Sequence, residues 1–358
     1  MQYFYEQLKD DNGTGHVAVI EEDRNKADLV TLEAINQTTV SLKQIDCISI
    51  LTQMSMENRY MNKKLYLECK DVRDYINWLQ RLARNEEENL FTHSYVSETR
   101  GKSDKKIPWN CKSLFDAYEQ YRWPFSYFDF LLNKKVKGES RNESKTVLDS
   151  LELRLHKAIE EGLNEDCYQI CIMILDWGGV LGSDKKGNKK KLNGLKSELS
   201  EYLTKVKSLF ESESVSLTHQ YKVIINNQDV PVVMNAGFTK IYSLLCNEFI
   251  IYDGRVGAAL GLLVRKYCEE NHISEVPNNL GFYYGNAKNI KVNRNPSKSP
   301  YKFKSLSSSS PVHIRNNLKA NWLIQKMFED NCGEFSLLTH PIRSFESALF
   351  MIGYRINR

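Results

Sequence analysis

Apolar residues recur every three or four positions along most of the chain beyond Val147, with charged and polar residues between them. This spacing buries one face of an α-helix. The pattern predicts helices at about 147–159, 168–175, 195–210, 256–267, 319–328 and 343–354. In the fourth of these, the apolar stripe consists of Val256, Ala259, Leu260, Leu263, Val264 and Tyr267. The second half of the chain is therefore predicted to be mainly helical.

The first seventy residues have a different pattern. Short β-branched or alternating runs, separated by Asp, Asn, Gly and Lys, predict strands at 17–20, 29–32, 40–42, 48–50 and 65–67. An amphipathic helix is predicted to follow from about Asp71 to Arg84, with Trp78 beside its apolar face. Strands followed by one such helix resemble a pleckstrin-homology-like fold. The alternative is a small antiparallel sheet, capped by the helix, that packs or binds a protein partner.

Polar segments suggest where domains end. Residues 1–88 are predicted to be the β-rich domain, and the charged stretch 89–107 a linker. Residues 108–358 are then a second, largely helical domain, so the predicted class is α+β. Its aromatic segment 109–130 is interpreted as core. The stretch 277–311 is rich in Asn, Ser, Pro and Lys and is predicted to be a long loop, a type that is often functional.

The candidate catalytic residues lie within the stretch 235–267. Gly237 is predicted to open a helix that carries Lys240, and a short apolar connector then ends at Asp253, where the next helix begins. At an N-cap, unpaired amide donors and the helix dipole stabilise an anion. A carboxylate held there, with an amine one helix upstream, can stabilise or attack an electron-poor carbon.

This arrangement resembles the helix-hairpin-helix DNA glycosylases, particularly the 8-oxoguanine-glycosylase-like branch. Gly237-Phe-Thr-Lys240 matches the family's hairpin and lyase lysine, and Tyr252-Asp253-Gly-Arg-Val256 matches its aspartate segment. The resemblance is close over residues 235–267, looser over 145–358, and does not include the first hundred residues. It implies an α-helical glycosylase domain that flips a damaged or modified base out of double-stranded DNA and cleaves its N-glycosidic bond.

The resemblance also implies catalytic roles for Asp253 and Lys240. Asp253 would stabilise the oxocarbenium-like transition state. Lys240 would be a Schiff-base nucleophile that gives the protein lyase activity, or else a phosphate contact. Only 13 positions separate the two (253 − 240 = 13), so we expect water to be the nucleophile. A plain helix cap at Asp253 and an exposed lysine at Lys240 are the structural alternatives.

Further residues are candidates for contact with DNA. The expected phosphate-binding residues are Gly237, Thr239, Arg255, Lys189, Lys190, Lys191, Lys302 and Lys304. The expected base pocket consists of Trp177, Asp176, Tyr252 and Trp322, with Arg343 and Glu346 as additional candidates. The alternatives are a solvated lysine loop, a glycine needed only for its turn, and aromatic residues that belong to the core.

The composition of the chain excludes few further classes of function. The 49 Lys and Arg residues against 45 Asp and Glu give a net charge of +4, which does not by itself indicate a nucleic-acid-binding protein. The eight cysteines are scattered, with no C-x₂-C pairs, so we expect no metal and no cofactor. No signal peptide or membrane-spanning run is apparent, and we expect a cytoplasmic protein.

Three interpretations follow. The first is a glycosylase, acting in repair or in defence against phage with modified DNA. The second is a catalytically silent DNA-binding module that tolerates Asp253→Asn. The third is a non-enzymatic interaction or regulatory protein, which recruits partners through its N-terminal domain and has no salt-dependent affinity for DNA.

Overall fold

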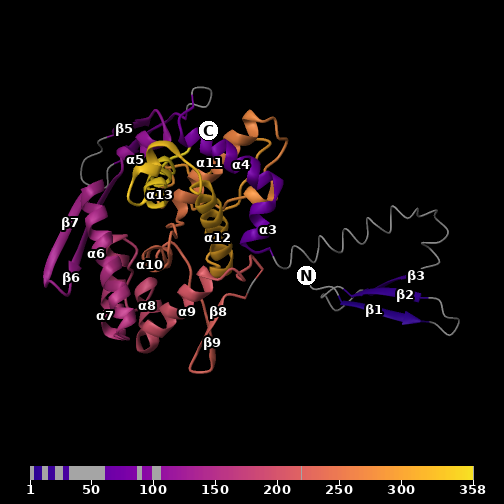
Figure 1. The fold of residues 1–358 in the computed structure, drawn as a ribbon, viewed down its shortest axis with the longest axis horizontal. Coiled ribbons are helices and arrows are strands. Elements are labelled where there is room, and N and C mark those ends of the chain that lie inside the picture. The colour runs from indigo at the N-terminus through magenta and orange to yellow at the C-terminus, as the bar shows by residue number, and fades with distance from the viewer. Residues whose placement is uncertain are drawn as a thin grey trace. The chain divides into compact units, whose positions relative to one another are not determined.

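The computed structural model describes the backbone of three N-terminal strands and of residue 98 and, in full, residues 61–86, 91–97, 106–218 and 220–357. The chain divides into two compact units, Met1–Tyr60 and Met61–Arg358. In the first unit, β1 (Phe4–Lys9), β2 (Gly15–Ile20) and β3 (Ala27–Thr31) form an antiparallel sheet in the order β1-β2-β3 (Figure 1). Strands β2 and β3 overlap two predicted strands. The strands predicted at 40–42 and 48–50 lie outside the described residues.

The predicted closing helix belongs to the second unit instead. It is α4 (Lys70–Ala83), which follows α3 (Lys63–Glu68), where a strand had been predicted. Helix α4 packs against α11 (Gly254–Glu270) and α12 (Ser310–Met327). The Trp78 indole N–H donates to Glu270 at 2.6 Å. The domain boundary thus lies near residue 60 instead of residue 88, because the apolar face of α4 completes the larger core.

The predicted linker and the start of the predicted helical domain form β-hairpins. Strand β4 (His93–Glu98) pairs with β5 (Lys106–Cys111), and β6 (Arg122–Asp129) pairs with β7 (Lys134–Ser140). Helix α5 (Leu114–Glu119) lies between the two hairpins in sequence. Along β6 the side chains alternate between exposed and buried positions, with Phe125 and Tyr127 inside. That two-residue period is typical of a strand, which explains why residues 122–129 form a strand instead of a helix.

Helices make up most of the remaining unit, which confirms the mixed α+β class. The other helices are α6 (Arg141–Glu160), α7 (Asn164–Trp177), α8 (Asn188–Asn193), α9 (Leu199–Glu211), α10 (Phe238–Leu245) and α13 (Pro341–Ile352). A third hairpin joins α9 to α10 and consists of β8 (Lys222–Ile225) and β9 (Gln228–Pro231). The element directly before the Gly237 turn is therefore a β-hairpin and not a helix.

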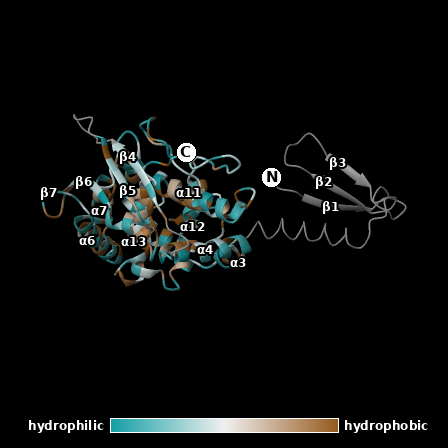
Figure 2. Ribbon diagram, turned by 90° about the horizontal axis from the view of Figure 1, so that it is seen from above, coloured by the Kyte–Doolittle hydropathy of each residue, from teal (hydrophilic) through white to brown (hydrophobic). Residues whose placement is uncertain are grey.

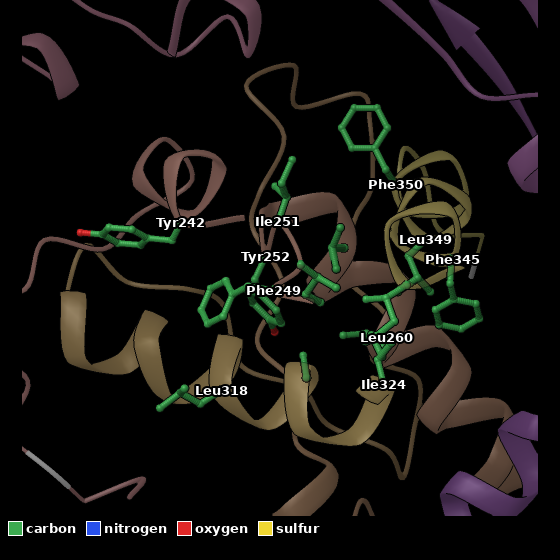
Figure 3. Packing of buried hydrophobic residues seen from close by; sticks show 14 of the residues in the cluster. Tyr242, Phe249, Ile251, Tyr252, Leu260, Leu318, Ile324, Phe345, Leu349 and Phe350 are labelled. Carbon is green, nitrogen blue, oxygen red and sulfur yellow. The ribbon is translucent and has the colours of Figure 1, made fainter. Parts of the chain in front are cut away.

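The core of the second unit holds the connector between α10 and α11 in place. Brown segments gather in the middle of this unit in Figure 2, around α13, and teal segments cover its outside, as on α6 and α3. Figure 3 shows Phe249, Ile251 and Tyr252 of the connector among side chains of α12 and α13. Asp253 at the end of the connector is thus supported by packed structure on several sides. Among the described residues, no helix is long and apolar enough to cross a membrane.

Candidate active site

A cleft of about 1280 Å³ opens into the second unit. Its walls come from β4, β5, the start of β6, α6, α13 and the segment 285–289. Asp253, Lys240 and Glu346 line it, together with His313. The cleft therefore brings together ionisable groups from α10, α11, α12 and α13.

Asp253 caps α11, as the sequence predicts. Its Oδ1 accepts hydrogen bonds from the amides of Arg255 at 2.8 Å and Val256 at 3.2 Å, and its side chain is 15% exposed. Burial acts to raise the pKa of the Asp253 carboxyl. The charges of Lys240 and Arg255 and the two amide hydrogen bonds outweigh this effect, so the pKa lies below its ordinary value. Asp253 is thus an ionised carboxylate whose second oxygen, Oδ2, makes neither of these capping bonds.

Lys240 lies beside that carboxylate. Its Nζ is 3.7 Å from Asp253 Oδ2 and donates to the Ala236 carbonyl oxygen at 2.9 Å, and its side chain is only 6% exposed. Gly178 makes room for the lysine, because a Cβ there would lie 2.4 Å from Lys240 Cδ. The structure thus brings together the two predicted catalytic residues.

Buried side chains of α10 and α12 hold the connector that leads to Asp253. The Thr239 hydroxyl accepts from the Tyr252 amide at 2.9 Å and donates to Asn317 Oδ1 at 2.8 Å. His313 Nε2 donates to the Tyr252 carbonyl oxygen, and burial lowers the pKa of His313 to about 4, so this imidazole is neutral. Asn321 Oδ1 accepts from the Ile250 amide at 2.7 Å.

Two predicted contact residues are consequently inaccessible. Thr239 is fully buried and holds the connector, so the prediction that it binds DNA is wrong. Tyr252 is also fully buried and donates through its hydroxyl to the Tyr283 carbonyl oxygen at 2.8 Å, outside the cleft lining. Its backbone positions Asp253, but its side chain does not form a base pocket.

Position 237 requires glycine because the side chain of Asn188 lies close to it, and not because its backbone angles are unusual. Its φ of −89° is open to any residue, but a Cβ would lie 2.0 Å from Asn188 Nδ2 in α8. Its amide already donates to Asn235 Oδ1 at 2.7 Å. That amide is therefore not free for a phosphate, contrary to the expected contact. The glycine instead lets α8 approach the turn that precedes Lys240.

Arg255 sits among aromatic rings on the cleft wall. Its guanidinium carbon lies 4.2 Å from the centroid of Phe350, 5.0 Å from that of Tyr354 and 5.6 Å from that of Trp123. Among the described residues, its guanidinium has no hydrogen bond or ion pair. A cation at a helix N-terminus opposes the helix dipole. An anionic ligand in the cleft would supply the missing acceptor.

The other predicted pocket residues separate into two groups. Trp177 lines the cleft, and so do Arg343 and Glu346. Asp176 is not part of the cleft lining, and Trp322 is buried in the core with its ring 5.8 Å from that of Tyr66. Both therefore fail as base-pocket residues.

Sequence reasoning missed much of the aromatic wall. The unexpected aromatic residues of the cleft are Tyr95, Trp109, Tyr118, Tyr121, Trp123, Phe350 and Tyr354. Tyr95 stacks on Trp109 across the β4–β5 pair, with centroids 4.6 Å apart. The two-residue alternation of aromatic and polar residues in 121–128 was the available signal that β6 faces inward on one side.

The predicted phosphate-binding lysines lie in two segments, 189–191 and 302–304, that adjoin the cleft. Asn188 at the start of α8 donates to the Val180 carbonyl oxygen at 2.7 Å, and Val180 lines the cleft. Backbone hydrogen bonds join the segment 304–306 to Tyr284, next to the cleft-lining segment 285–289. The lysines of these segments are Lys189, which pairs with Asp184 at 3.0 Å, and the exposed Lys190, Lys191, Lys302 and Lys304.

Within the described residues, no group of three or more His, Cys, Asp or Glu side chains is arranged to hold a metal ion. Comparison with protein-family models, with curated proteins and with solved structures finds no match to this chain. Function is therefore inferred from the residues of the cleft.

Proposed function

We propose that this protein is a DNA glycosylase that takes a flipped, damaged or modified base into the cleft and hydrolyses its N-glycosidic bond. The observation that carries the proposal is the pair formed by the Lys240 ammonium and the Asp253 carboxylate, 3.7 Å apart on the cleft wall. An ionised carboxylate at the wall of a large, aromatic-lined cleft fits a reaction whose transition state is positively charged at carbon.

In this mechanism Asp253 provides the electrostatic stabilisation of the transition state. As the bond between the base and C1′ lengthens, positive charge develops on the sugar, and the carboxylate stabilises it. The two amides that bind Oδ1 orient the group, so no reorganisation is needed at the moment of reaction. Water then adds to C1′ on the side that the carboxylate faces.

Lys240 has a positioning role in this proposal. Its Nζ donates to the Ala236 carbonyl oxygen at 2.9 Å and forms an ion pair with the Asp253 carboxylate at 3.7 Å, which favours a lysine that orients Asp253 over one that attacks C1′. Arg255 is proposed to bind a phosphate of the flipped nucleotide, since it lacks an acceptor and lines the same cleft.

The proposed fold is a variant of the helix-hairpin-helix glycosylase domain. Its support is the order of a glycine turn, helix α10 with Lys240, a connector, and α11 capped by Asp253. In this variant the β8–β9 hairpin stands where the first helix of the motif is expected.

The base-release experiment tests the proposal directly. The pure protein is incubated with duplexes carrying 8-oxoguanine, 7-methylguanine, hypoxanthine, uracil or glucosylated 5-hydroxymethylcytosine, and released base is measured by mass spectrometry. Release of one of these bases supports the glycosylase. DNA binding without release favours the silent DNA-binding module, and a folded protein that binds no DNA in low salt favours the interaction protein.

Neutralising the exposed lysines of α8 should flatten the salt dependence of DNA binding. Each phosphate contact contributes about 0.9 to the slope of log K against log salt, so Lys190→Gln with Lys191→Gln should reduce the slope by about 2. Binding should weaken equally for every DNA sequence. The control is Lys64→Gln with Lys205→Gln, which removes two exposed lysines from α3 and α9, outside the cleft lining. An equal change of the salt slope in both double variants would contradict the proposal that α8 binds DNA.

Gly178→Ala should slow base release by about 10²-fold and lower the melting temperature. The new Cβ would displace the Lys240 side chain, and a misplacement of about 1 Å in a site can cost that much. The φ of Gly178 is −73°, so alanine adds no backbone strain. Gly281→Ala is the control, because φ is also −73° there and the nearest atom would lie at 3.6 Å. Unchanged activity in Gly178→Ala would mean that the position of Lys240 does not matter.

A further inference from the structure

A second carboxyl group, that of Glu346 in α13, faces the cleft. Its side chain is 6% exposed, and Oε2 accepts a hydrogen bond from the Ile251 amide at 3.1 Å. Among the described residues, Oε1 has no hydrogen-bond partner, and the residue lines the cleft. One oxygen of Glu346 is therefore held by the connector, and the other is available to a molecule in the cleft.

No cation neutralises this carboxyl group within its own helix. Arg343, one turn earlier in α13, instead donates to Asp149 at 3.2 Å and to Glu152 at 2.7 Å in α6. The remaining ionisable groups that influence Glu346 are Asp253 and Lys240, and its own charge acts on Tyr121. A buried carboxyl without a paired cation is more stable when it carries a proton.

The pKa values of the two carboxyl groups in the cleft, those of Glu346 and Asp253, are shifted in opposite directions. Burial raises the pKa of Glu346 to about 7, while the Ile251 amide, Arg343 and Lys240 act to lower it and Asp253 to raise it. The pKa of Asp253 lies below its ordinary value. At neutral pH one group is thus ionised and the other is a proton donor for a substantial part of the time. Such a division is how paired carboxyl groups share acid and base roles.

We infer that Glu346 is the general acid that protonates the departing base in the hydrolysis assigned to this cleft. The inference rests on the proposed glycosylase function. When the bond from C1′ to the base nitrogen breaks, its electron pair goes to the base, and the Glu346 proton goes to a ring nitrogen or carbonyl oxygen of that base. The water oxygen bonds to C1′, and its proton goes to the Asp253 carboxylate. Both carboxyl groups then exchange protons with solvent through the cleft.

The test compares Glu346→Gln with the wild type on the duplexes named above. Glutamine keeps an oxygen that can accept from the Ile251 amide, so the connector stays in place. Wild-type base release in single-turnover experiments should fall as the pH rises above about 7. The variant should be about 10²- to 10⁴-fold slower at pH 6.5 and should lack this fall. Release of 7-methylguanine, whose ring is already cationic, should be affected less than release of 8-oxoguanine or hypoxanthine.

A control separates acid catalysis from simple support of the connector. Asn321→Ala removes the acceptor of the neighbouring Ile250 amide, and Asn321 does not line the cleft. It should lower the melting temperature but leave the pH profile and the order of the bases unchanged. An identical loss of pH dependence in Asn321→Ala and Glu346→Gln would reduce Glu346 to a structural role.

Melting temperatures give a readout that does not depend on activity. A pKa raised on folding means that the native state binds the Glu346 proton more tightly than the unfolded chain does. The wild type should therefore lose stability relative to Glu346→Gln as the pH rises from about 4.5 to about 7, and the difference should then level off. A difference that is constant over this range would overturn the inference, since the pKa of Glu346 would then be the same in the native and the unfolded state.

The outcomes distinguish the inference from the function on which it rests. Base release by the wild type, with an unchanged rate and pH profile in Glu346→Gln, would overturn the inference and leave the glycosylase standing. A folded wild type that releases no base from any of the duplexes would overturn both.

Discussion

Asp253→Asn should abolish base release, by about 10³-fold or more, while DNA binding stays intact or becomes tighter. The substitution removes the negative charge that is proposed to stabilise the oxocarbenium-like state. Asparagine is as good an N-cap as aspartate, and its oxygen can still accept from the amides of Arg255 and Val256. The fold and the phosphate contacts therefore survive. Single-turnover base release, DNA affinity and melting temperature measured on the same preparation check all three expectations.

Ser113→Ala is the matched control for a lost helix cap. Ser113 caps α5, accepts from the Asp116 amide at 2.9 Å and does not line the cleft. Its replacement should cost about 1 kcal/mol of stability and leave base release unchanged. Full base release by Asp253→Asn would contradict the proposed mechanism, whatever the results for the other variants. It would also favour the interpretation in which Asp253 is only a helix cap.

The local features of the candidate site could be predicted from sequence because short-range rules determine them. Asp253 precedes a run of apolar residues at helical spacing, and this combination predicts an N-cap without knowledge of the fold. The same reasoning places Lys240 in the preceding helix. Their distance of 3.7 Å depends on the connector, whose course is set by side chains of α12 and α13.

Features that depend on distant packing could not be predicted in the same way. Thr239 is buried because Asn317, 78 positions away, accepts its hydroxyl hydrogen. Trp322 is in the core because α3, near the other end of the second unit, covers it through Tyr66. Amphipathic spacing shows that one face of a helix is buried, but not which element buries it. The sequence therefore predicts the buried face of α4 but not the unit to which this helix belongs.

The missed hairpins have a different cause. Composition favours a linker at 89–107 and an aromatic core segment at 109–130, whereas the two-residue alternation along β6 indicates a strand. Trp123 and Tyr121 were consequently not considered as cleft residues, although they help to form its wall. A period of two in a stretch of aromatic residues predicts a half-buried strand as clearly as a period of 3.6 predicts a helix.

Lys240→Gln is expected to reveal whether the lysine is a nucleophile or a positioning residue. With the wild type, we expect base release without a covalent protein–DNA adduct when borohydride is present, because Nζ donates to the Ala236 carbonyl oxygen and forms an ion pair with Asp253. Lys240→Gln removes the ion pair and leaves the Asp253 carboxylate with its two amide partners. Stability should fall by about 2 kcal/mol, and base release should slow by about 10²-fold or more, as in Gly178→Ala.

Lys207→Gln provides a control with the same kinds of partner. Lys207 Nζ donates to the Leu245 carbonyl oxygen at 3.0 Å and pairs with Glu211 at 3.5 Å, outside the cleft lining. Its loss should change stability slightly and base release not at all. A borohydride-trapped adduct in the wild type that is absent from Lys240→Gln would contradict our expectation. It would make the protein a bifunctional glycosylase and lyase, since only an amine that attacks C1′ forms a reducible Schiff base.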